Sequence, residues 1–219
     1  MREVWVYKKI ISLKNLKKGI TIMKKVILPS LIFLSSILCA NELMYTSSVK
    51  NLYENIDNNT AKGRLLPTSE ITVLEKKDGK IKIQVQGYMK EDVSNAIYFN
   101  QKNRILIAGL TKENNFEIKT ISTNKDEEGN VWKKVELTAF TNDDNLTKDI
   151  NSLYTEAEKI YKDSCSMCHQ AHPIDEYTAN QWPSIIKSML SRTAMTKEQN
   201  YLVVQYLQKH AKDIKGEEK

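Results

Sequence analysis

Residues 63–89 read GRLLPTSEITVLEKKDGKIKIQVQGYM, and this stretch decides the fold of the middle of the chain. Apolar and polar residues alternate through two short runs, at Ile71/Val73 and at Ile81/Ile83/Val85. A period of two places the apolar side chains on one face of a half-buried strand. Asp78-Gly79 stands between the runs, and glycine accepts the positive φ of a tight turn. The stretch therefore predicts a β-hairpin.

Two further strands are expected at 105–110 and 131–137, joined by charged turns such as KDEEGN. Short strands at this spacing predict a small barrel or sandwich. The hairpin stretch resembles a bacterial SH3-like domain, although Lys80-Ile81 stands where such domains often carry an aromatic residue. We therefore expect a β-rich SH3-like domain over residues 63–145. The polar, Asn-rich residues 41–62 before it are expected to form a linker.

The hydrophobic period changes after Asp143-Asp144. Apolar residues then fall at helical spacing, at Ile150, Leu153, Tyr154, Ala157, Ile160 and Tyr161. A second helix is expected from Trp182-Pro183, because proline suits the first helical turn. A third is expected from Thr196, where T-K-E-Q has the spacing of a capping box. The expected fold class is α+β: a small SH3-like barrel, then an all-α cytochrome c-like domain over 146–213 and a charged tail at 214–219.

Residues 165–169 read CSMCH, and a C-x-x-C-H run is the attachment signature of c-type haem. Two thiols two residues apart add to the two vinyl groups, and the adjacent imidazole is placed under the iron. Cys165 and Cys168 are therefore the predicted thioether donors of one covalent haem c. His169 is the predicted proximal ligand of the iron.

Zinc and thiol–disulfide exchange are the two rival uses of CSMCH. A structural zinc site needs four N/S ligands, and beyond His172 the sequence offers no second cysteine pair. A redox C-x-x-C normally opens a helix after a strand in a βαβ unit, whereas this one ends a helix. Both rivals are less favoured than haem.

The sixth ligand of the iron is the open question. The candidates after residue 40 are Met44, Met89, Met167, Met189, Met195, His172 and His210. Met189 is preferred, because it lies on a helix face expected to look at the haem, and Met195 is the alternative. Core packing is the commoner use of methionine. A histidine ligand or an open iron site also stays possible.

The chain of 219 residues has a net charge of +6 that comes from its N-terminal segment. Residues 1–40 hold eight basic side chains and one acidic, and the rest hold 25 basic and 26 acidic. No Lys/Arg cluster marks the remainder, so we expect no nucleic-acid partner. Lys24-Lys25 precede 13 apolar residues, VILPSLIFLSSIL, and Ala40 is small enough to precede a cleavage site. Spanning a bilayer takes roughly 20 residues.

These features predict a signal peptide at 23–40 and a periplasmic mature chain without a stable membrane span. Residues 1–22 are expected to be a non-native extension, because Met23 begins a complete signal peptide by itself. Three alternatives stay open: a cytoplasmic anchor in 1–22, a lipoprotein modified at Cys39, and a chain anchored by an uncleaved signal.

Several segments of the C-terminal region are more specific than a haem motif alone: CSMCH (165–169), YTANQW (177–182), KSM (187–189) and YLQKHAKD (206–213). They resemble the C-terminal monohaem domain of the TorC-type pentahaem cytochromes of trimethylamine-N-oxide (TMAO) reductase systems. The β region resembles the domain preceding that haem, through GRLLPTSEITVL (63–74), NRILIAGL (103–110) and VWKKVELTAF (131–140). The resemblance covers roughly residues 45–213. In the family a methionine matches Met189, while the position of Met195 is often leucine.

The sequence departs from that family in having a single C-x-x-C-H. TorC-type proteins carry four further haems and a membrane anchor, through which they oxidise quinol. The resemblance therefore implies a monohaem electron shuttle for anaerobic respiration. It would accept electrons from a separate quinol-linked donor and pass them to a molybdopterin N- or S-oxide reductase acting on TMAO or dimethyl sulfoxide.

We expect an electron-transfer protein rather than an enzyme, because no Ser/His/Asp or paired-carboxylate constellation stands out. One alternative is the cytochrome subunit of a periplasmic dehydrogenase such as sulfite dehydrogenase, with electrons flowing the other way. Another is a haem-based sensor or binding module with an open iron site.

Overall fold

The computed structural model describes residues 41–214. The predicted extension (1–22), the predicted signal peptide (23–40) and residues 215–219 of the predicted tail lie outside the described residues. Strands hold 36% of the described part and helices 23%, so the fold is mostly β. Within this part, no helix has the length and the apolar character needed to cross a membrane.

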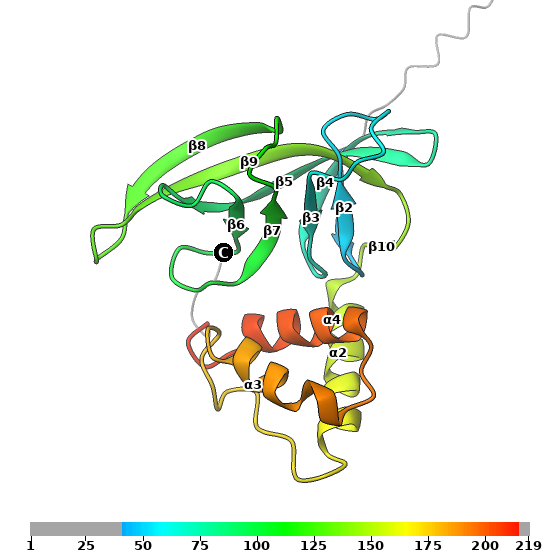
Figure 1. Cartoon of the computed structure of the whole chain (residues 1–219), viewed down its shortest axis with the longest axis vertical. Helices are drawn as coiled ribbons and strands as arrows, with labels where there is room; N and C mark the ends of the chain where they lie inside the picture. The colour runs from blue at the N-terminus through cyan, green and yellow to red at the C-terminus, as the bar shows by residue number, and fades with distance from the viewer. Residues whose placement is uncertain (1–40, 215–219) are drawn as a thin grey trace, which may run out of the picture. The chain divides into compact units, whose positions relative to one another are not determined.

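Ten strands of the described residues share one sheet (Figure 1). They are β1 (Glu42–Thr46), β2 (Lys50–Leu52), β3 (Gly63–Leu65), β4 (Glu70–Lys77), β5 (Lys80–Lys90), β6 (Ala96–Tyr98), β7 (Leu106–Leu110), β8 (Glu117–Lys125), β9 (Val131–Asn142) and β10 (Leu146–Thr147). The strands predicted around Ile71, Ile81, Ile107 and Val131 are confirmed as β4, β5, β7 and β9.

Strand β5 is the centre of the sheet. It pairs antiparallel with β9 along its full length, from Lys80↔Asn142 to Lys90↔Trp132. Its other edge is shared, since β4 pairs with its first half and β6 with its second. The strand order is β10-β1-β4-β5-β6-β7-β3-β2, with β8 added to the free side of β9.

The predicted turn between β4 and β5 is confirmed. Asp78 has φ 51° and Gly79 has φ 75°, so both turn residues are left-handed. This is the backbone of the two-residue turns that match the twist of a hairpin. The alternation of apolar residues therefore gave the correct register: Ile81, Ile83 and Val85 are all buried.

The sheet curls into a half-barrel, and a single bridge ties its end back to β9. Tyr53, directly after β2, exchanges two backbone hydrogen bonds of 2.9 Å with Phe140. Strands β6, β7, β3 and β2 follow one another outward from β5, so β2 is the last strand on that side. The bridge joins the residue after β2 to β9, which pairs with the other edge of β5. The curled sheet encloses a buried core that includes Leu52, Leu65, Ile83, Val85, Ile97 and Leu137.

Gly87 in β5 lies where the strand paired with β5 changes from β4 to β6, and it allows buried side chains to pack closely there. A Cβ at this position would lie 2.5 Å from Ile97 Cγ2, 2.8 Å from Ile107 Cδ1 and 2.8 Å from the Tyr98 carbonyl oxygen. Real Cβ atoms essentially never come within 3.0 Å of such neighbours. The strand therefore needs glycine here for the close approach of side chains, not for an unusual φ.

Three α-helices and one short 3₁₀ helix follow the sheet in the described residues. They are α2 (Ile150–Cys165), α3 (Trp182–Met189), η1 (Leu190–Arg192) and α4 (Lys197–Lys209). The capping box predicted at Thr196 is confirmed: the Thr196 hydroxyl accepts from the Gln199 N–H, and the Gln199 side chain accepts from the Thr196 N–H. The starts predicted for the second and third helices are therefore correct.

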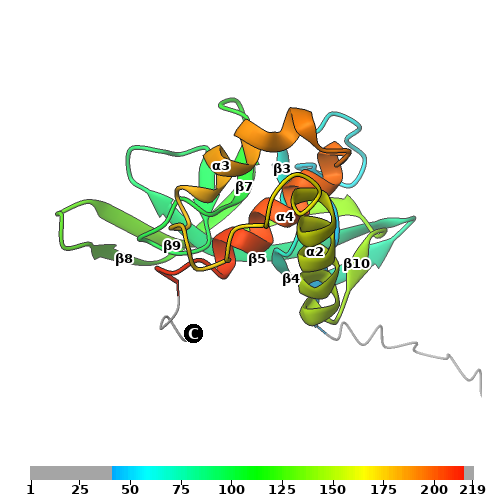
Figure 2. The same ribbon diagram turned by 90° about the horizontal axis from the view of Figure 1, so that it is seen from below.

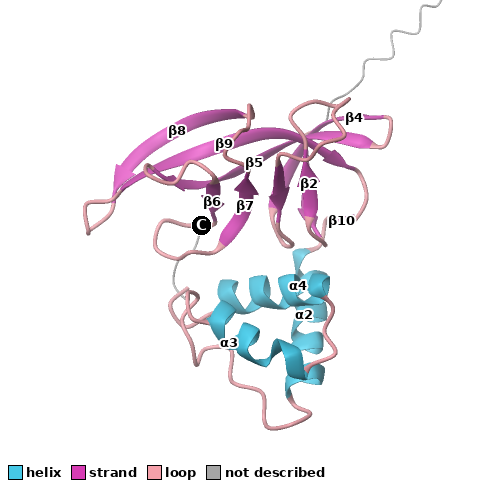
Figure 3. Cartoon of the chain, in the orientation of Figure 1, coloured by secondary structure: helices cyan, strands magenta, loops and turns pink. Residues whose placement is uncertain are grey.

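The helices lie together against one side of the sheet (Figures 2 and 3). Their core contains Ile105, which precedes β7, beside Leu153, Trp182 and Leu207 of the three helices. Polar contacts also cross the boundary. Gln205 Nε2 donates to the Leu106 carbonyl oxygen at 2.9 Å, and Asn103 Nδ2 donates to Asp213 Oδ2 at 2.6 Å.

The predicted fold class is wrong. The prediction was an α+β chain with a small SH3-like barrel and a separate all-α cytochrome c-like domain. The sheet instead begins at Glu42, because residues in the expected linker form β1 and β2 and pair with β4 and β3. The helices do not form an all-α haem domain, because they share a core and hydrogen bonds with the sheet.

Tyr154 of α2 provides a test of the packing between the helices and the sheet. Burial, followed by the neighbouring Tyr45 and Glu70, raises the pKa of Tyr154 to about 12. Unfolding returns this phenol to its usual pKa of about 10. The unfolded chain therefore loses this proton first, and we expect the free energy of unfolding to fall between about pH 10 and 12. Denaturant titrations should show a shallower fall in Tyr154→Phe; an unchanged slope would contradict burial of this hydroxyl.

Candidate functional site

One cavity in the helical part brings together the residues predicted for the cofactor. Cys165, Cys168, His169 and Met189 all line it. Most of the remaining wall is apolar or aromatic and includes Tyr161, Trp182, Ile185 and Ile186. Two thiols, one imidazole and the thioether of Met189 therefore line one largely apolar cavity.

Helix α2 delivers the two cysteines. Asp149 caps its start, accepting from the Asn151 N–H at 2.9 Å, and Cys165 is its last residue. Cys168 and His169 follow in the turn beyond the helix, so all three sit where the helix ends. Neither cysteine is in a disulfide. Burial raises the pKa of the Cys165 thiol, which therefore stays protonated at neutral pH.

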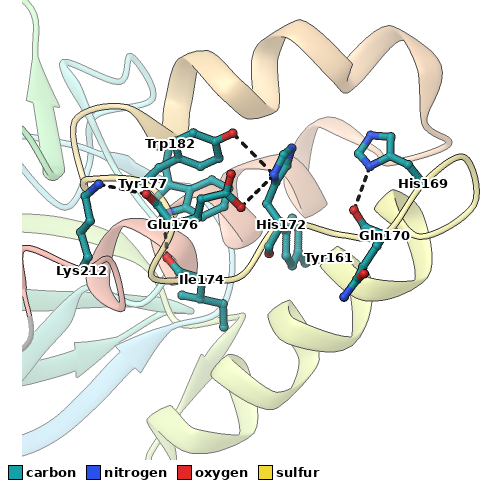
Figure 4. A network of polar contacts seen from close by, with 9 residues as sticks. All are labelled: Tyr161, His169, Gln170, His172, Ile174, Glu176, Tyr177, Trp182 and Lys212. Carbon is teal, nitrogen blue, oxygen red and sulfur yellow. Dashed lines mark hydrogen bonds and ion pairs between the residues drawn. The ribbon is translucent and has the colours of Figure 1, made fainter.

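His169 is held in one orientation by its own neighbour. Its Nδ1 lies 2.8 Å from the Gln170 carbonyl oxygen (Figure 4). A carbonyl oxygen only accepts, so Nδ1 carries the proton and Nε2 keeps its lone pair. This is the tautomer that binds a metal through Nε2.

A second histidine stands beside the first. The ring centroids of His169 and His172 are 5.7 Å apart, edge to face. His172 Nδ1 lies 3.0 Å from Glu176 Oε2 and 3.5 Å from the Tyr177 hydroxyl, which together fix its ring (Figure 4). His172 also lines the cavity, so the structure places both imidazoles of this loop at one site.

The back wall of the cavity is built on Trp182. This side chain is fully buried, and its Nε1 donates to the Ile174 carbonyl oxygen at 3.1 Å. The rings of Tyr161 and Tyr177 contact it edge-on, with centroids 6.0 and 5.1 Å away. The Tyr161 hydroxyl donates to the His172 carbonyl oxygen at 2.9 Å, and burial raises the Tyr161 pKa. The wall is therefore apolar in surface yet fixed by hydrogen bonds behind it.

The structure separates the two methionines proposed as sixth ligand. Met189 ends α3, is 37% exposed and lines the cavity. Met195 is not among the lining residues and packs against the helical core. Met44 and Met89 belong to the sheet, and Met167 is 82% exposed.

Sequence reasoning missed three polar residues of the cavity wall. Ser164, Arg192 and Thr193 line it, and none was singled out from the sequence. No sequence pattern marked Arg192 or Thr193, because only the folded chain brings them to the cavity. Tyr206 does not line the cavity, and its ring contacts Tyr154 and His210.

The donor set fits a covalent haem. Two unpaired thiols, an imidazole with a free Nε2 and an apolar wall meet at the same cavity. Across residues 41–214, no group of three or more His, Cys, Asp or Glu side chains is arranged to hold a metal ion directly.

Comparison with known proteins gives the class of the chain. Residues 39–146 match the family model described as the TorC third cytochrome c domain. That match covers the sheet, and CSMCH follows beyond its end. No solved structure matches. With the haem-type donor set described above, the match defines a c-type cytochrome.

Individual relatives make the identification more specific. Cytochrome c-type protein TorY of Escherichia coli O157:H7 is 33% identical over 152 residues, 68% of this chain and 40% of the relative. Cytochrome c-type protein TorC of E. coli K12 is 25% identical over 179 residues, 81% of this chain and 46% of the relative. The chain is a TorC-like cytochrome that resembles the C-terminal part of these proteins. It spans less than half the length of each.

Proposed function

We propose that this chain carries one haem c, which Cys165 and Cys168 would hold covalently and whose iron His169 and Met189 would bind. The observation that supports this is the shared cavity, which all four residues line. Haem supplies a one-electron Fe(III)/Fe(II) couple. The chain therefore acts as an electron carrier and not as an enzyme.

The surrounding residues adjust this couple. The Gln170 carbonyl oxygen, 2.8 Å from Nδ1, orients the His169 ring and leaves the lone pair on Nε2 for the iron. A methionine thioether as second ligand raises the reduction potential of haem. The apolar wall around Trp182 and Ile186 excludes water, which disfavours the more charged Fe(III) state. The site is built for a relatively high potential.

The size of the cavity supports exchange of electrons at the surface. Its volume is about 150 Å³. Pockets that enclose a drug-sized ligand measure about 300–1,000 Å³. Cys168 and Met189, which would hold the haem, are both exposed at this cavity. A cofactor held by them would lie close to the surface, where electrons can pass to a partner.

The proposed pathway runs in the periplasm during anaerobic respiration. A quinol-linked donor would supply an electron to this chain, and the chain would pass it to a molybdopterin N- or S-oxide reductase acting on TMAO or dimethyl sulfoxide. The similarity to TorC and TorY supports this partner. Outside residues 1–40 the charges nearly cancel, with 25 basic and 26 acidic, so long-range steering is weak and the contact is transient. Export predicts Asn41 as the first residue of the mature chain.

The direction of electron flow is tested by two mixtures. The reduced protein, mixed with the reductase and TMAO or dimethyl sulfoxide, is expected to be reoxidised. The oxidised protein, mixed with sulfite dehydrogenase and sulfite, is expected to stay oxidised. The opposite pair of results would assign the chain to a dehydrogenase, and binding of carbon monoxide without any reoxidation would assign it to a sensor.

Replacement of Met189 tests the sixth ligand. We expect Met189→Ala to lose the near-red absorption band of methionine-bound Fe(III) and to lower the reduction potential, because the thioether favours Fe(II). Met195→Ala is the matched control, since Met195 packs in the helical core and not at the cavity. Loss of the band in the Met195 variant alone would assign the ligand to that residue.

A further inference from the structure

Arg192 is the charged residue of the cavity wall. Among the residues that line the cavity, it alone is a lysine, arginine, aspartate or glutamate. Arginine is permanently charged and presents a planar fork that matches a carboxylate. Within the described residues, its guanidinium makes no ion pair or hydrogen bond with another side chain. The cavity therefore offers one unused cation.

The backbone that carries Arg192 is fixed. Arg192 ends η1, and Thr193 directly after it donates to the Leu190 carbonyl oxygen through both its N–H (3.2 Å) and its hydroxyl (3.0 Å). The two cysteines come from the end of α2, so Arg192 approaches the cavity from a different segment. An anion held in the cavity would meet this cation beside a largely apolar wall.

We propose that Arg192 binds a carboxylate of the bound cofactor, and this rests on the haem proposed above. Haem carries two propionate carboxylates on the edge opposite the vinyl groups that react with cysteine. With the vinyl edge held at Cys165 and Cys168, Arg192 would be the charged residue of the cavity wall available to a propionate. A carboxylate beside an apolar wall needs a partner, and a forked arginine pair is the strong form of that contact.

The pair affects the iron electrostatically. An unneutralised propionate favours the more positively charged Fe(III) state, and Arg192 cancels that charge. Removing Arg192 therefore lowers the reduction potential. Arg192 is exposed, so salt weakens the pair, but a direct hydrogen-bonded contact keeps more of its effect at high ionic strength than a distant surface charge does.

The test compares holo-protein variants by redox titration and by the vibrational band of the haem propionates. Arg192→Gln is expected to lower the potential at low and at high salt and to shift the propionate band. Arg192→Lys is expected to fall between, since it keeps the charge and loses the fork. Lys187→Gln is the control: it removes one positive charge from an exposed position of α3 that does not line the cavity.

The possible outcomes distinguish failure of the Arg192 proposal from failure of the haem proposal on which it rests. Wild-type protein without covalent haem overturns both. Haem-loaded Arg192→Gln with the wild-type potential and propionate band overturns the role of Arg192 and leaves the electron carrier intact. A shift of equal size in Arg192→Gln and Lys187→Gln, abolished by salt, shows a general surface charge and also overturns the pair.

Discussion

Replacing Cys165 and Cys168 together with alanine is expected to yield a protein without covalently bound haem. Both thiols line the cavity, and haem c is held through thioethers to such a pair. Without them only the bonds from His169 and Met189 to the iron would remain, and a haem held by ligation alone leaves when the protein is denatured. Mass spectrometry of the denatured protein measures this directly: the wild type exceeds its polypeptide mass by one haem, and the double variant does not.

Met167→Ala is the matched control for the cysteine variant. Met167 lies between the two cysteines, and its side chain is 82% exposed. Its removal is expected to leave haem attachment and the absorption spectrum unchanged. If the wild type, coexpressed with the cytochrome c maturation machinery, has only its polypeptide mass, the haem proposal fails. Zinc in the purified protein, or a reversible Cys165–Cys168 disulfide, would then support one of the two rival uses of CSMCH.

Gly87→Ala is expected to destabilise the half-barrel by about 1–3 kcal/mol, because it overpacks a filled core. The new Cβ would lie 2.5 Å from Ile97 Cγ2 and 2.8 Å from Ile107 Cδ1. Ile97 is fully buried and Ile107 is 5% exposed, so neither side chain has space to withdraw. The Tyr98 carbonyl oxygen, also 2.8 Å away, belongs to the β5–β6 ladder. Urea titration measures the loss as a lower midpoint.

Gly109 provides the control for this glycine. It lies in β7 of the same sheet, and an added Cβ would meet nothing closer than 3.8 Å. Gly109→Ala is therefore expected to change the free energy of unfolding by less than about 0.5 kcal/mol. Equal losses in the two variants would show a general cost of adding a methyl group to these strands, and the close packing at Gly87 would be rejected.

The sequence predicted the elements whose own residues determine them. The β4–β5 hairpin follows from alternation and Asp78-Gly79, and α4 follows from the capping box at Thr196. It did not predict β8, because nearly every residue of Glu117–Lys125 is exposed and no alternation marks the strand. It also did not predict β1 and β2, which are short and depend on partners distant in the chain.

The predicted fold class failed because sequence patterns do not show which elements share a core. Gln205 and Asp213 look like ordinary polar residues in the sequence. In the structure they bind the Leu106 carbonyl oxygen and Asn103, and so join the helices to the sheet. The donor residues of the site could be read from C-x-x-C-H, because covalent chemistry imposes that spacing. Arg192 could not, because only the folded chain brings it to the same cavity.

The pairing of β1 with β10 has a consequence for biosynthesis. Tyr45 lies opposite Thr147, so one of the first strands to be made waits for one of the last. Contacts so remote along the polypeptide make folding slow, since a long loop must close before they form. The ribosome finishes the sheet only when the start of α2 is about to appear. The β4–β5 hairpin can pair earlier, but one edge of β1 stays unpaired until residue 147 has been made.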